Sequence, residues 1–303
     1  MWKTVLLLIF TLVVVPTVAY FFGEPLNETK QDMLRTLAFV YVGFALLAFA
    51  ISTMTKNYSQ VDKLWSTLPI LYVILTAWYH PEPRVILMSI LVILWGVRLS
   101  YNFAMKGGFK WKFWEGEEDY RWGVLRQKEE FQGTFKWMIF NLAFISFYQL
   151  GLVLLMTLPI VEVIGSAHGL SWIDYGIAVI FLGFLIIETV ADKQQWTFQT
   201  KKYAFIHAGE ILPPNHAKGF LDRGLWKWMR HPNYMAEQAV WFVFYLFTLT
   251  AGSFWLNWSV IGALLLLVLF RSSSDFSEDI SESKYPEYAH YRKNVGRFLP
   301  KPW

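Results

Sequence analysis

Long apolar runs alternate with short polar segments along almost the whole 303-residue chain. A helix needs about 20 mostly apolar residues to cross the hydrocarbon core of a bilayer. Lipid offers the backbone no hydrogen-bond partner, so such runs are predicted to be helices. Eight runs qualify, of which the third and the seventh are short: Thr4–Phe22, Leu37–Met54, Leu64–Tyr79, Val85–Phe103, Trp137–Ile160, Trp172–Val190, Met235–Thr250 and Phe254–Phe270. The pattern predicts an all-α polytopic membrane bundle of about eight transmembrane helices.

The distribution of Lys and Arg predicts the orientation of these spans. The chain has 27 Lys and Arg residues. If all eight runs are spans, Lys30, Arg35 and Arg84 lie on one side of the membrane, Arg98 lies inside a span, and all other Lys and Arg residues lie on the opposite side. Basic residues collect on the cytoplasmic side of membrane proteins. We therefore expect both termini to be cytoplasmic. The first run follows Lys3 and has the alternative of a cleaved signal peptide, but its length favours a retained helix.

The predicted spans also suggest how the chain is organised. Residues 1–61 read as an N-terminal transmembrane hairpin, and residues 62–303 as one membrane domain. This domain carries two long cytoplasmic loops, 106–136 and 192–230, and a cytoplasmic tail that starts at Arg271. Polar chemistry is expected in these three cytoplasmic pieces.

Composition supports a membrane protein and narrows its chemistry. The chain is 55% hydrophobic and 19% aromatic, and it contains no cysteine, which excludes disulfides and thiolate metal sites. The net charge is +4, and the charged residues lie between the apolar runs, which favours membrane orientation over nucleic-acid binding. We expect a bilayer and a lipophilic small molecule as partners, with no nucleic acid and no known protein partner. There is no dinucleotide or Walker glycine motif, no hydrolase elbow and no His pair at metal-ligand spacing, so no metal is predicted.

The strongest candidate site lies where the second loop enters the seventh predicted span. Pro232 suits the first turn of a helix, where its missing N–H costs nothing. The helix N-terminus and Arg230 would then attract an anion such as phosphate. Asn233, Glu237 and Trp241 follow at steps of four and share one helix face. The pattern indicates a polar stripe that enters the membrane.

An alternative reading makes Arg230 and His231 interface anchors and lets Trp241 face lipid. It accounts for the basic pair but not for a carboxylate at Glu237, which is costly in a membrane unless it has a partner. We therefore favour a functional role for this stripe.

A second polar stripe lies at the end of the sixth predicted span. Glu188, Asp192, Gln195 and Gln199 follow one another at spacings of four, three and four, which places them on one helix face. The alternative is a solvated continuation of the helix beyond the bilayer, and for Gln199 that alternative is favoured. For Glu188 and Asp192 both readings stay open.

A third group of polar and aromatic residues gathers near the third and fourth spans. Arg98 would either snorkel to the interface or pair with an acid such as Asp62, Glu188 or Glu237. The group comprises Asp62, Trp65 and Ser66 on one span and Trp95, Arg98 and Asn102 on the next. The three groups together predict one polar cavity that opens to the cytoplasm.

These motifs resemble the steroid 5-alpha-reductase family, most closely a largely uncharacterised bacterial-type branch. The resemblance covers roughly residues 62 to 300. It is carried by Arg230-His231-Pro232-Asn233-Tyr234 with Glu237 and Trp241, by Asp62-Lys63-Leu64-Trp65-Ser66, Trp95-Gly96-Val97-Arg98-Leu99, Asp119-Tyr120-Arg121 and Ala191-Asp192-Lys193-Gln194-Gln195, and by the ending from Tyr285 to Pro300. The Arg-His-Pro-x-Tyr core is also similar to membrane methyltransferases of the isoprenylcysteine carboxyl methyltransferase type.

The resemblance implies an NADPH-dependent reductase of an activated C=C bond in a steroid-like or other lipid substrate. It implies three sets of site residues. The cofactor-binding set is Glu188, Asp192, Gln195, Arg230, His231, Asn233, Tyr234, Glu237, Trp241 and Arg271; the substrate-binding set is Trp65, Trp95 and Arg98; the catalytic set is Asp62 with Tyr101. Where the steroid enzymes carry a basic, histidine-rich stretch, this chain has Ser272-Ser273-Ser274-Asp275. The branch implies a bacterial inner membrane.

Two other functions compete with the reductase. The first is a methyltransferase that uses S-adenosylmethionine on a lipid or a prenylated protein, and it rests on the shared Arg-His-Pro-x-Tyr core. The second is a non-enzymatic scaffold or a small transporter. No inverted repeat or broken helix pair supports a transporter.

Overall fold

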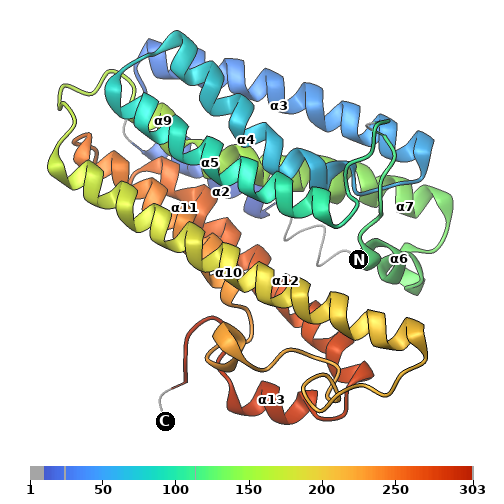
Figure 1. Cartoon of the computed structure of the whole chain (residues 1–303). Helices are drawn as coiled ribbons and strands as arrows, with labels where there is room; N and C mark the ends of the chain where they lie inside the picture. Colours follow the sequence, from blue (N-terminus) through green and yellow to red (C-terminus); the bar gives the residue numbers. More distant parts are fainter. Residues whose placement is uncertain (1–9, 24, 113, 302–303) are drawn as a thin grey trace. The chain divides into compact units, whose positions relative to one another are not determined.

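The structure is a computed structural model that describes residues 10–23, 25–112 and 114–301. In this part of the chain the regular structure is helical, and the β-type pairing recorded there is an isolated bridge between Met229 and Gly296. The all-α prediction is therefore confirmed (Figure 1). The chain forms two compact units, here called unit 1 (Met1–Ala178 with Phe244–Leu265) and unit 2 (Val179–Val243 with Leu266–Trp303).

Unit 1 is built mainly from the first half of the chain. Two of its segments, η1 and η3, are π-helical, and η2 and η5 are short 3-10 turns. Its elements are η1 (Phe10–Val14), α2 (Val15–Phe22), α3 (Glu28–Thr55), α4 (Gln60–Tyr79), α5 (Pro83–Met105), α6 (Tyr120–Arg126), η2 (Glu129–Phe131), α7 (Thr134–Phe140), η3 (Asn141–Tyr148), α8 (Gln149–Thr157), α9 (Pro159–Glu162) and η5 (Trp258–Val260).

Unit 2 contains the segments that carry the Arg-His-Pro motif and the tail. The boundaries between the units fall inside three long helices, α10, α11 and α12. The elements are α10 (Trp172–Ala208), η4 (Gly224–Lys227), α11 (Pro232–Thr250), α12 (Ile261–Lys284) and α13 (Tyr288–Asn294). The first part of the predicted loop 192–230 is therefore helical, because α10 continues to Ala208.

Five helical segments in the described chain are long and apolar enough to cross a membrane. They are Glu28–Thr55, Pro83–Met105, Thr134–Glu162, Trp172–Ala208 and Trp258–Lys284. The two runs that looked short in the sequence form α4 and α11, which are not among the five. Thr4–Phe22 lies partly outside the described residues. A membrane protein is confirmed, whereas the count of eight spans and the position of the termini stay predictions.

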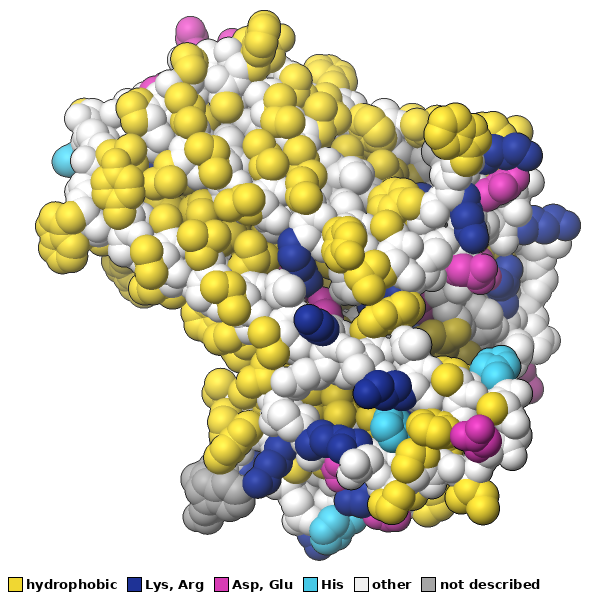
Figure 2. Space-filling model, in the orientation of Figure 1, with side chains coloured by type: hydrophobic (Ala, Val, Ile, Leu, Met, Phe, Trp, Pro, Cys, Tyr) yellow, Lys and Arg dark blue, Asp and Glu magenta, His cyan; other side chains and the backbone are white. Residues whose placement is uncertain are grey.

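The surface of unit 1 has the character expected of helices in lipid. Large apolar side chains on α3 and α4 are exposed, among them Phe39, Met54 and Trp78. Figure 2 shows hydrophobic side chains spread over the helices of this unit, while charged side chains gather over α6 and the loop before it, and over α13 and its neighbouring loops. A water-soluble protein rarely leaves so much apolar area uncovered, so lipid is the natural partner of this surface.

Helices α4 and α5 pack as a hairpin whose closeness depends on small residues. A Cβ on Gly96 would lie 2.6 Å from the carbonyl oxygen of Ser66. The Ser100 hydroxyl donates to the Ser66 hydroxyl at 2.8 Å across the same crossing. Small residues allow such close helix contact in membranes, so Gly96 and the two serines hold the segment that carries Asp62 against the segment that carries Arg98.

Two of the three cations predicted outside the cytoplasm are paired with buried carboxylates in unit 1. Lys30 Nζ lies 3.2 Å from Glu162 Oε1, and Trp258 Nε1 donates to Glu162 Oε2 at 2.6 Å. Arg84 Nε lies 3.0 Å from Asp174 Oδ1, with both side chains buried. Each of these two positive charges is therefore neutralised by a carboxylate of the same unit, and the predicted orientation of the spans stays a prediction.

Candidate functional site

The Arg-His-Pro motif in unit 2 is held by backbone contacts to the C-terminal tail. Arg230 N donates to Gly296 O at 2.8 Å and His231 N donates to Arg297 O at 3.0 Å. Helix α11 then begins at Pro232, where no N–H donor is needed. The carbonyl of His231 accepts the first helical bond, from Met235 N at 3.0 Å. The tail thus fixes where α11 starts.

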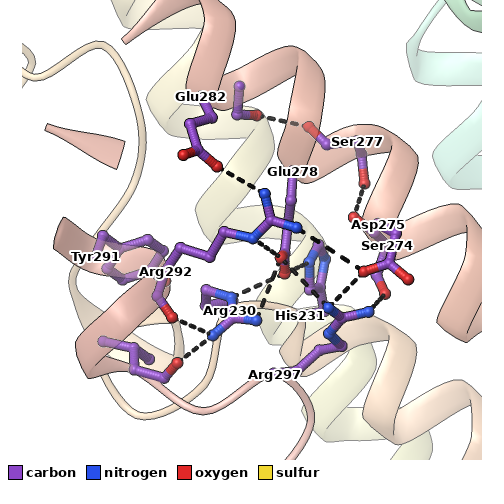
Figure 3. A network of polar contacts seen from close by, with 12 residues as sticks. Arg230, His231, Ser274, Asp275, Ser277, Glu278, Glu282, Tyr291, Arg292 and Arg297 are labelled. Carbon is purple, nitrogen blue, oxygen red and sulfur yellow. Dashed lines mark hydrogen bonds and ion pairs between the residues drawn. The ribbon is translucent and has the colours of Figure 1, made fainter. Parts of the chain in front are cut away.

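Glu278 on α12 is the centre of the charged network around this motif (Figure 3). Its side chain is fully buried. Its Oε1 lies 2.8 Å from Arg230 Nε, and its Oε2 lies 3.0 Å from Arg292 Nε. His231 Nε2 lies 2.8 Å from the same carboxylate, and Arg297 Nη2 lies 3.7 Å away. A buried carboxylate needs such partners to offset its lost hydration. Glu278 therefore ties α11, α12, α13 and the tail together.

Arg230 has little capacity left for a ligand in this arrangement. Its Nη2 donates to Glu278 Oε2 at 3.2 Å, and its Nη1 donates to the carbonyls of Arg292, at 2.8 Å, and Val295. Its phosphate-binding role stays a prediction, with a structural role now evident beside it. Arg271 is 64% exposed and lies 3.5 Å from Asp275, so its guanidinium is the more accessible of the two.

The pKa of His231 lies below the usual value of a histidine. Burial lowers the pKa of His231, and Arg230 and Arg297 lower it further, although Glu278 acts in the opposite direction. The ring stacks on Tyr234, with centroids 5.2 Å apart, and Tyr234 in turn lies 4.6 Å from the ring of Phe270. The predicted residues His231 and Tyr234 therefore form an aromatic stack beside the ion network.

The polar stripes of α10 and α11 meet, as their spacing suggested. Asn233 Nδ2 donates to Asp192 Oδ1 at 3.0 Å. One turn further along α11, Trp241 Nε1 donates to Glu237 Oε1 at 3.1 Å, and both side chains are buried. Glu188 on α10 is buried as well. The reading in which Trp241 faces lipid is wrong, because this ring is fully enclosed by protein.

Two amide oxygens in these stripes lack a hydrogen-bond partner in the described part of the chain. They are Oδ1 of Asn233 and Oε1 of Gln195, and both atoms are buried. Buried polar atoms are nearly always satisfied in folded proteins, and an exception calls for an explanation. Together with the carboxylate of Asp192, these oxygens form a group of acceptors that suits a ligand rich in N–H or O–H donors. We call Asp192, Gln195 and Asn233 the acceptor group.

Three residues of the ion network were not predicted from the sequence: Glu278, Arg292 and Arg297. Only the helix spacing of the first was visible in the sequence. Ser274 and Glu278 are four residues apart on the mixed segment after the last predicted span, so they share a helix face. The structure shows that both are fully buried, and this burial, which explains the need for a cationic partner, cannot be read from the spacing.

Asp62, a predicted catalytic residue, lies in the first turn of α4 in unit 1. Trp122 Nε1 donates to its Oδ2 at 3.3 Å. Burial raises the pKa of Asp62, and Arg121 offsets only part of that rise. The neighbouring Asp119 differs: burial raises its pKa too, but contact with Arg121 lowers it below the usual value. Asp62 is thus the carboxyl that more readily keeps a proton.

The other predicted residues of unit 1 are placed less favourably. Tyr101 is 66% exposed, and in the described residues no recorded hydrogen bond joins it to Asp62. Trp95 is fully buried, whereas Trp65 and Arg98 are half-buried. The structure does not bring Tyr101 and Asp62 together as a pair, and their catalytic roles stay predictions.

Comparisons with known proteins identify the family of the chain. Residues 48–295 match the family described as "Protein of unknown function (DUF1295)". An uncharacterized protein of Schizosaccharomyces pombe is 33% identical over 269 residues, which cover 84% of this chain and 75% of the yeast protein. No solved structure matches. The matched region includes the acceptor group and Glu278, and the chain belongs to the DUF1295 family.

Proposed function

We propose that this protein is a membrane-embedded, NAD(P)H-dependent reductase of an activated C=C bond in a steroid-like or other lipid substrate. The observation that carries the proposal is the acceptor group, where two buried amide oxygens lack partners in the described chain. The family is distantly related to steroid 5-alpha-reductase-like proteins, and the motif resemblance points the same way.

The residues of unit 2 fit the parts of NADPH. The carboxamide and the ribose hydroxyls carry the donors that Asn233 Oδ1 and Gln195 Oε1 lack, and Asp192 would accept from a ribose hydroxyl. The phosphates need accessible cations, and Arg271 offers an exposed guanidinium. Bound NADPH would supply a hydride to an electron-poor alkene carbon of the substrate.

The remaining predicted residues have supporting roles in this proposal. Buried Glu237 and Trp241 position the face of α11 that carries Asn233. Glu188, which is buried on α10 in the same unit, is proposed to contact the cofactor. In unit 1 the pKa of Asp62 is raised by burial, and the roles of Asp62, Trp65, Trp95 and Arg98 toward the substrate stay predictions from the motif resemblance.

A methyltransferase remains the second candidate, because the acceptor group also suits the ribose hydroxyls and the ammonium group of S-adenosylmethionine. The methionyl carboxylate of that cofactor would need a donor, and the exposed guanidinium of Arg271 would serve it as well as a phosphate. The motif resemblance around Asp62–Ser66 and Asp192–Gln195 is what favours the reductase.

The membrane is proposed to be a bacterial inner membrane, with both termini in the cytoplasm. The motif resemblance supports this assignment, and the yeast relative shows that the likeness extends to a eukaryote.

The test is cofactor binding by the purified full-length protein in detergent. NADPH should quench the fluorescence of the 16 tryptophans and raise the thermal midpoint. S-adenosylmethionine is titrated in parallel. Binding of S-adenosylmethionine without binding of NADPH would select the methyltransferase, and binding of neither would refute both enzymatic proposals.

A further inference from the structure

A short basic and aromatic segment projects from unit 1 between α5 and α6. From residue 109 to residue 114 the segment consists of lysines and aromatic residues, and the first acidic residue after Lys106 is Glu115. Trp111 is fully exposed and Trp114 is also exposed. We call Lys106, Lys110, Trp111, Lys112 and Trp114, which are all exposed, the basic–aromatic tip.

The base of this segment is firmly held. Gln60 Nε2 donates to the carbonyl of Trp114 at 2.8 Å, and Lys63 Nζ donates to the carbonyl of Glu115 at 2.7 Å. The Gln60 and Lys63 side chains are both buried on the first turn of α4. The segment is therefore tied to a helix, and the exposure of its tryptophans is a property of the fold.

The tip emerges next to a membrane span. Helix α5, Pro83–Met105, is one of the five candidate spans, and Lys106 is the next residue. The polar headgroup layer is about 5–8 Å thick on each side of the hydrocarbon core, so a segment that leaves a span at this point begins inside that layer. Indole rings favour this layer because it accommodates both an apolar ring and an N–H donor.

We propose that the basic–aromatic tip docks on anionic phospholipid headgroups of the membrane that α5 crosses. The tryptophans Trp111 and Trp114 enter the headgroup layer, and Lys106, Lys110 and Lys112 attract the anionic phosphates. Lys112 Nζ lies 3.3 Å from Glu115 Oε1 in an exposed ion pair, so the three lysines keep an excess of positive charge at the tip, which selects anionic over zwitterionic lipid. This surface is separate from the proposed cofactor site, and its function does not depend on the reductase activity.

The experiment uses the absence of cysteine in the chain, which allows one label to be placed cleanly. Glu115→Cys puts a fluorophore at the edge of the tip and leaves the backbone bond from Lys63 intact. It also releases Lys112 from its ion pair with Glu115, and this change is the same in every lipid composition compared. The full-length protein is reconstituted in phosphatidylcholine alone or mixed with phosphatidylglycerol. A water-soluble quencher then reports how far the label is shielded. Ile211→Cys, at an exposed position outside the tip, is the matched control.

Docking predicts that the label at 115 is shielded in the mixed bilayer and more accessible in phosphatidylcholine, while the label at 211 stays accessible in both. Adding Lys110→Gln and Lys112→Gln should shift the docking equilibrium about thirtyfold toward the free state. Trp111→Ser should expose the label as well. Equal accessibility in both lipids, or shielding that survives these substitutions in correctly folded protein, would overturn the proposal.

Discussion

Each unit contains one arginine that is buried against a carboxylate, and the two arrangements differ in what surrounds the pair. In unit 1, Arg84 pairs with Asp174 and gives its other N–H groups to the Ser166 hydroxyl and to loop carbonyls, including those of His168 and Gly169. Asp174 accepts in addition from Ser171 N at 2.7 Å. This cluster is one cation and one anion, closed on all sides.

In unit 2, Glu278 is shared by several cations, and the network continues outward. Arg292 pairs with Glu278 and also with Glu282, which is 41% exposed, and Arg297 pairs with Asp275. The network reaches from a buried centre to the surface, and its members come from α12, from α13, from the two residues that precede α11 and from the segment after α13 (Figure 3). The Arg84–Asp174 cluster thus holds the loop that contains His168 and Gly169, whereas the Glu278 network positions the start of α11, where Asn233 lies.

The largest effect is expected for Glu278→Gln. Removing the buried charge leaves Arg230 and Arg292 without their shared carboxylate, which costs about 3–5 kcal/mol of stability. NADPH affinity should fall as well, because the start of α11 loses its support. Both are measured by thermal unfolding and by NADPH titration in detergent. The control is Glu282→Gln, a half-exposed partner whose loss should cost under about 1 kcal/mol. Unchanged NADPH binding in the Glu278 variant would remove its positioning role.

Asp174→Asn should be comparably destabilising without an effect on the cofactor. Arg84 would lose its buried counter-charge, again at a cost of about 3–5 kcal/mol. Protein that remains folded at low temperature should bind NADPH with the affinity of the natural chain. A loss of affinity as large as that of the Glu278 variant would erase the distinction between the two clusters.

Asn233→Ala should show the opposite pattern. The substitution removes the bond from Asn233 Nδ2 to Asp192, which should lower the free energy of unfolding by about 0.5–1.5 kcal/mol. It also removes Oδ1, which has no partner in the described chain, so NADPH binding should weaken by the larger amount of about 1–3 kcal/mol. Asn215→Ala, at an exposed asparagine in the same unit, is the matched control. A drop in stability with normal binding would assign Asn233 to the structure alone.

The smallest effect concerns pH. The lowered pKa of His231 means that the ring takes up a proton at a lower pH in the folded protein than in the unfolded chain, where protonation occurs near pH 6.5. As pH falls below that value, the unfolded state binds the extra proton and stability declines, by at most about 1.4 kcal/mol per pH unit. His231→Gln should flatten this part of the profile of unfolding temperature against pH. His290→Gln, at an exposed histidine, should leave the slope as it was, and a flattening there would contradict the assignment.

Local spacing was sufficient to predict part of the site. Asp192 and Asn233 each belong to a stripe that is defined by steps of three or four residues, and the structure joins the two stripes at 3.0 Å. The burial of Glu237 was expected from its position one turn inside an apolar run. Such features depend on helix periodicity, which a single sequence displays directly.

The ion network could not be predicted in the same way. Arg230 and Glu278 are separated by 48 residues, and Lys30 and Glu162 by 132. No periodicity connects positions so far apart, because their contact depends on how separate helices pack. Arg230 was therefore predicted to be an unpaired phosphate donor, whereas its guanidinium is occupied by Glu278 and by the carbonyls of Arg292 on α13 and of Val295.

An experimental structure determined with NADPH present tests the central claim most directly. The account predicts cofactor N–H or O–H groups within hydrogen-bond distance of Asn233 Oδ1 and Gln195 Oε1, with the Arg230–Glu278 pair unbroken. Cofactor bound elsewhere, with both amide oxygens still lacking a partner, would contradict it.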